Sequence, residues 1–136
     1  MIIEHVAIWT HKLEEMKDFY VKYFNTAVDE KYVTDEGFPA HFELYFLSFD
    51  SGARLELCQM STIPQGDAAD GKETTGLTHI ALSAGSRAEV DRISANLKRD
   101  GYKFISDPRL TGDGYYESCV LDPDGNRVEI ITPPEK

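Results

Sequence analysis

The chain has 136 residues and a formal net charge of −10, and 41% of its residues are hydrophobic. This length suits one compact domain, or two very small ones that share a core. The acidic charge disfavours nucleic acid and anionic membrane surfaces as partners, because both are themselves negatively charged. No apolar run approaches the roughly 20 residues that a membrane-spanning helix needs.

The N-terminal segment is expected to begin a strand at once and not to be a secretion signal. It lacks a basic leader followed by a long apolar stretch. Without a secretion signal, the two cysteines, Cys58 and Cys119, are expected to be free thiols. The expected location is therefore the cytoplasm.

The first half of the chain predicts a strand, a helix and three further strands. Residues 2–10 alternate with period two, which predicts a strand with His5 and Trp9 on one face. Residues 12–25 change to helical spacing and predict an amphipathic helix, with Thr10 as its N-cap. The strands that follow are expected at 27–34, 41–49 and 53–59.

The second half predicts the same order of elements after a linker at 61–76. A strand at 77–83 is followed by a helix that begins at a capping box, Ser86 to Glu89, and that Gly101 ends. Three more strands are expected, at 102–105, 115–121 and 126–132, with Asp107-Pro108 breaking the first of them. The expected modules are thus 1–60 and 77–133.

Two chemically distinctive residue types recur at matching places in the two modules. His79 follows His5 by 74 positions, and Glu129 follows Glu56 by 73. Both glutamates stand in the pattern Gly-x-Arg-apolar-Glu-apolar. Since side chains alternate along a strand, each glutamate points away from its apolar neighbours, which pack on the helix.

These four residues suit a metal ion. A carboxylate on a mostly apolar strand needs a partner or a metal when it is buried. Two imidazoles and two carboxylates form a mixed nitrogen and oxygen set, which suits Zn²⁺, Ni²⁺, Fe²⁺, Co²⁺ or Mn²⁺. We therefore expect one divalent ion, held by His5, Glu56, His79 and Glu129.

A purely structural role for the glutamates is the alternative. Arg54 and Arg127 lie two residues before Glu56 and Glu129, on the same strand faces, and would be their ion-pair partners. This alternative explains one Glu–Arg pair in each half. It does not explain a histidine at the matched position of both halves.

The repeat, together with the segments IEHVAIW, FYVKYF and DPDGNRVEI, resembles the vicinal-oxygen-chelate superfamily from residue 2 to residue 132. Its members include glyoxalase I, methylmalonyl-CoA epimerase, extradiol dioxygenases and the bleomycin and fosfomycin resistance proteins. The resemblance implies a single α+β domain over 1–136, with two βαβββ modules whose eight strands form a cupped mixed sheet around one metal ion. It also implies a small-molecule substrate and a homodimer.

The ligand order His, Glu, His, Glu is most similar to bacterial glyoxalase I, lactoylglutathione lyase. The resemblance implies a Zn²⁺ or Ni²⁺ centre and a metal-dependent isomerase or lyase that acts on a small α-hydroxycarbonyl or a thiol hemithioacetal through an enediolate. A carboxylate beside the metal moves the proton between adjacent carbons. The resemblance favours Glu129 as this base and Glu56 as the ligand facing it, although the near symmetry of the halves leaves the assignment open.

The chain departs from glyoxalase I at two positions. Trp9 stands where that enzyme has an Arg that holds a carboxylate of glutathione, and Met60 stands where it has an Asn. Both changes replace polar recognition by apolar surface, so a different thiol or a different small α-hydroxycarbonyl is expected. Trp9 is expected either to stack on an apolar or planar substrate or to be a core residue.

Four further residues are candidates for contact with the substrate: Cys58, Arg109, Tyr115 and Tyr116. For each of them a purely structural role is the alternative. Cys58 lies on the face of Glu56, and the alternative for it is a small buried thiol. The other three flank a Gly-rich loop that resembles the substrate-covering loop of relatives, and their alternative is a plain hairpin. Two other functions also stay open: a drug-binding module of the bleomycin-resistance type, and an epimerase acting beside a thioester.

Overall fold

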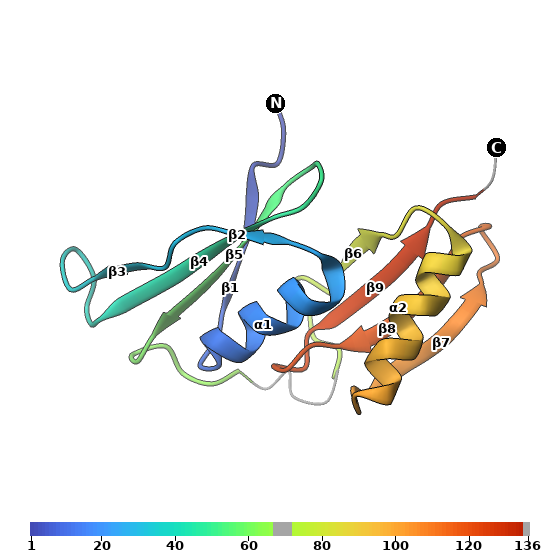
Figure 1. Ribbon diagram of the computed structural model, residues 1–136. Coiled ribbons are helices and arrows are strands. Elements are labelled where there is room, and N and C mark those ends of the chain that lie inside the picture. Colours follow the sequence, from blue (N-terminus) through green and yellow to red (C-terminus); the bar gives the residue numbers. More distant parts are fainter. Residues whose placement is uncertain (67–71, 135–136) are drawn as a thin grey trace. The chain divides into compact units, whose positions relative to one another are not determined.

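The computed structural model describes residues 1–66 and 72–134, which form nine strands and two helices (Figure 1). The chain divides into two compact units, Met1–Gly66 and a second unit to which residues 72–134 belong. In each unit one helix lies against one sheet, so the α+β class predicted from the sequence is confirmed. Residues 67–71, within the predicted linker at 61–76, lie outside the described residues.

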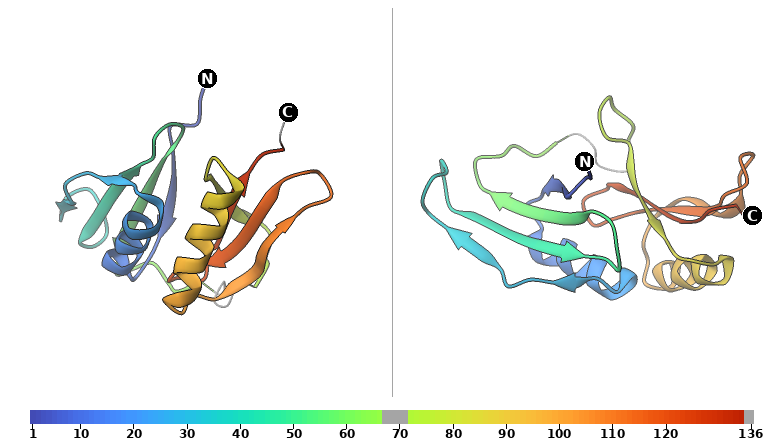
Figure 2. Two further views of the ribbon diagram at one scale, coloured as in Figure 1. Left: turned by 45° about the vertical axis from the view of Figure 1, so that its right-hand side comes forward. Right: turned by 90° about the horizontal axis from the view of Figure 1, so that it is seen from above.

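The first unit contains a sheet in the order β1-β5-β4-β2, with β3 also paired to β4 (Figure 2). Its elements are β1 (His5–Trp9), α1 (Leu13–Phe24), β2 (Ala27–Val28), β3 (Tyr32–Thr34), β4 (Phe42–Ser48) and β5 (Arg54–Met60). β1 runs parallel to β5, and the other neighbours are antiparallel.

The second unit contains a sheet in the order β6-β9-β8-β7. Its elements are β6 (His79–Ser83), α2 (Arg87–Arg99), β7 (Phe104–Leu110), β8 (Tyr116–Leu121) and β9 (Arg127–Thr132). Here too the first strand of the unit runs parallel to the last, and the other pairs are antiparallel. The pairing of the two halves therefore follows one plan.

Each helix covers one face of its own sheet. In the first unit the hydroxyl of Tyr45 on β4 donates to Glu14 on α1 at 3.1 Å, and Leu47 and Leu57 on the same face are fully buried. In the second unit Ser118 on β8 and Ser94 on α2 share a buried hydrogen bond of 2.8 Å. Among the described residues, the opposite face of each sheet is covered by no helix of the same unit.

The helices begin differently. Ser86 is the N-cap of α2, and its hydroxyl accepts from the backbone N–H of Glu89 at 3.2 Å, as the capping box predicts. The prediction of Thr10 as N-cap of α1 is wrong. Lys12 holds that position without a side-chain cap, and the Thr10 hydroxyl accepts from the backbone N–H of Lys12 instead.

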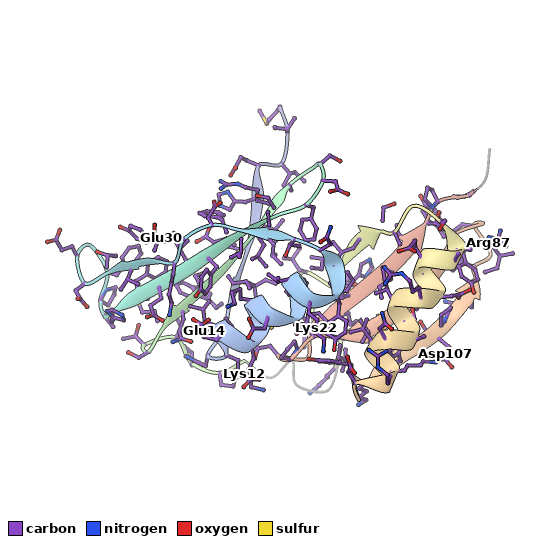
Figure 3. The ribbon with its side chains drawn as sticks, in the orientation of Figure 1. Lys12, Glu14, Lys22, Glu30, Arg87 and Asp107 are labelled. Carbon is purple, nitrogen blue, oxygen red and sulfur yellow. The ribbon has the colours of Figure 1, made fainter. Side chains whose placement is uncertain are left out.

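Charged side chains at the helix ends complement the helix dipoles. Glu14 lies in the first turn of α1 and Lys22 in its last turn (Figure 3). Negative charge near a helix N-terminus and positive charge near its C-terminus are stabilising. Among the described residues, no helix has the length and apolar composition to cross a membrane.

Two strands differ from the predictions. The strand expected at 27–34 is two short strands, because Asp29 and Glu30 favour strand poorly, and both pieces pair with β4. The first unit therefore has five strands and not four. The break expected at Asp107-Pro108 is also wrong, since β7 continues through Pro108 to Leu110.

The continuation of β7 has a physical reason. β7 is the last strand in the order of its sheet, where proline's missing N–H is tolerated. Its pairing with β8 shifts register between Phe104 and Ser106, and again between Ser106 and Arg109. Pro108 falls within the second of these irregular stretches, so no regular ladder hydrogen bond is lost there.

Candidate metal and substrate site

The first unit brings His5 and Glu56 into contact on the face opposite α1. His5 begins β1, and the parallel register pairs Ala7 with Glu56, so that His5 lies diagonal to the glutamate. The imidazole Nε2 is 3.3 Å from Glu56 Oε2. The other ring nitrogen, Nδ1, contacts the carboxylate of Glu4, which holds the ring with Nε2 directed at Glu56.

The second unit repeats this arrangement. His79 begins β6, Ala81 pairs with Glu129, and His79 Nε2 is 3.2 Å from Glu129 Oε2. The ring Nδ1 lies 2.6 Å from the hydroxyl of Thr78. The predicted residues therefore meet as two pairs, one in each unit, with nearly equal separations.

The two pairs have the chemistry of metal ligands. Donors that share one ion at distances of 2.0–2.2 Å and a tetrahedral angle lie about 3.3 Å apart. A ligating histidine commonly has its second ring nitrogen held by a carboxylate or another polar group, the position that Glu4 and Thr78 occupy. The side chains of Glu56 and Glu129 are only 14% and 22% exposed, so each carboxylate is largely removed from water.

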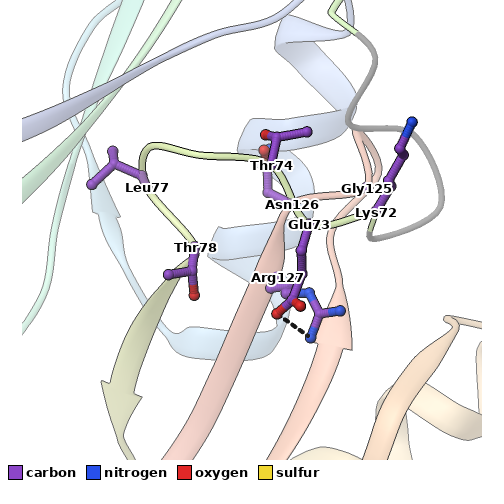
Figure 4. A pocket seen from close by; sticks show the side chains of 8 residues that line it. All are labelled: Lys72, Glu73, Thr74, Leu77, Thr78, Gly125, Asn126 and Arg127. Atoms are coloured by element: carbon purple, nitrogen blue, oxygen red, sulfur yellow. Dashed lines mark ion pairs between the residues drawn. The ribbon is translucent and has the colours of Figure 1, made fainter.

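The arginines that could have neutralised these glutamates have other partners. Arg54 pairs with Glu4 at 2.5 Å, and its guanidinium lies 4.0 Å from the centre of the Phe46 ring. Arg127 pairs with Glu73 at 3.7 Å, at the wall of a small hollow (Figure 4). Other residues that line the hollow include Lys72, Thr74, Leu77, Thr78, Gly125 and Asn126. Both of these ion pairs are made with glutamates other than Glu56 and Glu129.

The assembly of both pairs around a single ion stays a prediction. Within residues 1–66 and 72–134, no place gathers three or more His, Cys, Asp or Glu side chains in an arrangement that could hold a metal ion. What the structure supplies is one nitrogen and one oxygen donor in each unit.

Trp9 and Cys58 both lie on the face that carries Glu56, paired with each other across β1 and β5. Trp9 is 45% exposed, so it is not a core residue. The thiol of Cys58 is buried and donates to the carbonyl of Ile8 at 3.4 Å. Burial first, and then the charge of Glu56, raise the pKa of Cys58 to about 11. The thiol is therefore neutral at ordinary pH and acts as an apolar surface.

The residues predicted around the Gly-rich loop fall on different faces. Arg109 on β7 lies 4.0 Å from Glu117 on β8, a residue that shares the face of Glu129. Tyr115 precedes β8, and its carbonyl accepts from the backbone N–H of Thr111. Tyr116 donates to Asp91 on α2 at 2.7 Å, so it lies on the helix-covered face. Tyr116 and Glu129 therefore lie on opposite faces of the sheet, and contact of Tyr116 with substrate stays a prediction.

Three aromatic residues that the sequence did not single out share the site face of the first unit or its margin. Phe46 pairs with Glu56 across β4 and β5, and its ring meets that of His5 edge-on at 5.5 Å. Phe42 is buried against Cys58 and Met60. Phe38 stacks on Phe42. The aromatic content of 41–49 was visible in the sequence, but the register that sets these rings beside Glu56 was not.

Comparison with known proteins supports the fold. The "Uncharacterized protein YqjT" of Bacillus subtilis (strain 168) is 36% identical over 61 residues, which are 43% of this chain and about half (48%) of that protein. A glyoxalase family protein from Bacillus cereus superposes with a TM-score of 0.81 at 12% identity, over 99% of this chain and 95% of that one.

A variant of glyoxalase I from Zea mays superposes with a TM-score of 0.77 at 22% identity, over 98% of this chain and 45% of that one. Such likenesses, at low identity, speak to the fold alone. The family model of the Glyoxalase/Bleomycin resistance protein/Dioxygenase superfamily matches residues 2–130, nearly the whole chain. The chain therefore belongs to the Glyoxalase/Bleomycin resistance protein/Dioxygenase superfamily.

Proposed function

We propose that this protein is a metal-dependent isomerase or lyase, similar to glyoxalase I, that acts on a small α-hydroxycarbonyl or a thiol hemithioacetal. One observation carries the proposal: each unit brings one imidazole and one carboxylate to 3.2–3.3 Å on its helix-free face. The arginine that precedes each glutamate by two residues has an ion pair with another residue, Arg54 with Glu4 and Arg127 with Glu73. The glyoxalase I structure from Zea mays, which shares the fold, adds support from a relative of this chemistry.

The metal ligands in this proposal are His5, Glu56, His79 and Glu129, and Zn²⁺ or Ni²⁺ suits them best. A bound divalent ion would hold two adjacent substrate oxygens and stabilise the negative charge that develops when a C–H proton leaves. Iron, cobalt and manganese ions are the alternatives that a mixed nitrogen and oxygen set admits.

The chain's own residues supply orientation and proton transfer. Glu4, itself held by Arg54, fixes the His5 ring, and Thr78 contacts the corresponding nitrogen of His79. Glu129 is the proposed base because its carboxylate is the more exposed of the two and therefore the more accessible to substrate. It takes a proton from one carbon and returns it to the neighbouring carbon, so the product is an isomer of the substrate.

Metal analysis together with turnover tests this proposal. Protein purified without added chelator should carry one divalent ion per chain. If two copies of the chain share their ligands, it should carry one ion for each pair of shared sites. It should isomerise methylglyoxal adducts of at least one thiol in a panel. Chelation should abolish turnover, and restoring Zn²⁺ or Ni²⁺ should recover it. Glu129→Ala should remove turnover, whereas Glu30→Gln, on an exposed residue of the first unit (Figure 3), should not.

Two results would contradict the proposal. If metal-free wild-type protein still turned over these adducts, the proposed metal ligands would not be needed for the reaction. Full activity in Glu129→Ala would remove the proposed base. We also propose that the protein is a cytoplasmic homodimer, which light scattering of the purified protein and cell fractionation would check.

A further inference from the structure

The helix-free face of the first unit changes character along its strands. The paired residues Trp9 and Cys58 lie two positions beyond the pair Ala7 and Glu56. Leu44 completes the outer row on β4. Two residues along a strand correspond to about 7 Å. A small molecule held at His5 and Glu56 therefore reaches an apolar surface within one further row of side chains.

That apolar surface has a buried floor and open walls. Phe42 is the floor, with Cys58 and Met60 beside it, and all three are buried. The Trp9 ring meets Phe42 edge-on at 5.9 Å, and the Phe38 ring stacks on Phe42 at 4.2 Å. Trp9 and Phe38 remain 45% and 43% exposed. We call Trp9, Phe38 and Phe42 the aromatic cluster.

The second unit serves as an internal control for this feature. The position that matches Trp9 is Ser83, and its neighbour on β9 is Ile131. On β8 that row continues to Glu117, which lies near Arg109. The same module architecture thus carries a serine, an isoleucine and a glutamate in this row, with Arg109 near the glutamate. Aromatic side chains at this place are not a requirement of the fold, so they call for a reason specific to the first unit.

Solvent-exposed aromatic rings next to the pair His5 and Glu56 favour a ligand that has a polar part and an apolar part. A large aromatic side chain contributes up to about 250 Å² of contact area and prefers edge-on or offset partners. Among the described residues of the first unit, the arginine on β5, Arg54, lies at the opposite end of that strand from Trp9 and is paired with Glu4, so it is not placed to hold a carboxylate beside the aromatic cluster. An anionic peptide thiol such as glutathione would gain little there.

We propose that the substrate of this protein has two parts: a metal-chelating group with two adjacent oxygens, and an aromatic or planar apolar substituent attached to it. The chelating group lies at His5 and Glu56, and the substituent packs on the aromatic cluster. The inference rests on the proposed function, because that function supplies the chelating group of the substrate. It adds the substrate class, and it makes Trp9 and Phe38 determinants of specificity.

Two hydroxamates test this inference, since both present two adjacent oxygens to a metal ion. Acetohydroxamate ends in a methyl group, and benzohydroxamate ends in a phenyl ring. Calorimetric titration of the metal-loaded protein should give at least about tenfold tighter binding of benzohydroxamate, equivalent to about 1.4 kcal/mol. Trp9 is the chain's single tryptophan. Its fluorescence should therefore change with benzohydroxamate and stay constant with acetohydroxamate.

Variants assign the preference to the cluster. Trp9→Ala should reduce the ratio of the two affinities to within about twofold of unity, with acetohydroxamate binding unchanged, and Trp9→Phe should restore most of the ratio. Phe38→Ala, at an exposed position, should lower the ratio by a smaller factor. Val28→Ala is the matched control: Val28 is an exposed apolar residue that pairs with Leu47, on the helix-covered face of the same sheet.

The failure of this inference is distinguishable from the failure of the proposed function. Equal affinities for the two hydroxamates, or a ratio that Trp9→Ala leaves unchanged, would overturn the aromatic subsite while the metal site stands. Absence of binding by either hydroxamate to metal-loaded protein would overturn both. Circular dichroism of each variant before titration ensures that a changed ratio does not reflect unfolding.

Discussion

The two units share their chemistry and differ in its surroundings. Each sets a histidine at the start of its first strand against a glutamate on its last strand, at 3.3 Å in one unit and 3.2 Å in the other. Beyond that pair the first unit continues into aromatic rings, and the second into a serine, an isoleucine and a glutamate that lies near an arginine. Under the proposed function, the repeated pair would hold the ion, and the divergent row beyond it would contact the substrate.

The largest effect should come from exchanging the two glutamates for glutamine. Glu129→Gln should lower kcat by roughly 10²–10⁴-fold if this residue moves the proton. Glu56→Gln should lower kcat less and show its main effect as lost metal. Steady-state kinetics with metal analysis of each variant measures both. A larger loss of kcat in Glu56→Gln than in Glu129→Gln would make Glu56 the base and exchange the roles of the two units.

Matched core residues should show whether the units are equally stable. Leu57 and Ile130 occupy corresponding positions on β5 and β9, and both are fully buried. Leu57→Ala and Ile130→Ala should each lower the free energy of unfolding by about 2–5 kcal/mol, because each leaves a cavity beneath its helix. Chemical denaturation measures the loss. A variant that unfolds in two separate steps would show that the units unfold independently.

The helix caps should give a smaller difference. Ser86→Ala should destabilise the protein by about 1 kcal/mol, since the hydroxyl no longer accepts from the N–H of Glu89. Thermal unfolding measures the change, with Ser61→Ala in an exposed turn as the control. Lys12→Asp should act in the opposite direction, because α1 lacks a side-chain cap. Equal stability of wild type and Ser86→Ala would show that the cap contributes nothing.

The two thiols should show the smallest difference between the units. Cys58 and Cys119 are both buried, and burial raises the pKa of each thiol. At pH 8 an aromatic disulfide reagent should label both far more slowly in folded than in denatured protein, because the thiolate is the reactive form. The variants Cys58→Ala and Cys119→Ala separate the two rates. Rapid labelling of one thiol alone would identify its unit as the one that opens.

Much of this architecture follows from the sequence because alternation and helical spacing are local. The period of two around His5 and the spacing of apolar residues in 12–25 predict β1 and α1 to within a few residues. The repeat also identifies the two histidines and two glutamates, and the structure adds that each histidine contacts the glutamate of its own unit. The pairing inside each unit follows from strand order, since β1 and β6 each lie beside the last strand of their unit.

What the sequence could not provide depends on pairing between distant strands. Phe42 and Phe46 share the face of Glu56 only through the register of β4 on β5. Tyr116 flanks the Gly-rich loop in the sequence, but only the register of β8 on β9 shows that its side chain lies on the face covered by α2. Pro108 breaks strands in general, yet β7 tolerates it at the margin of the sheet.

The position of the histidines has a consequence for how a metal would affect dynamics. In both units the histidine belongs to the strand that ends the sheet order, β1 in one and β6 in the other. An edge strand has hydrogen bonds to its sheet on one side only, so it should open locally at a lower free-energy cost than a central strand. An ion bound by the histidine of this edge strand and the glutamate of the neighbouring strand would stabilise the edge of the sheet. Amide hydrogen exchange along both strands should therefore slow on metal uptake, even where no substrate is bound.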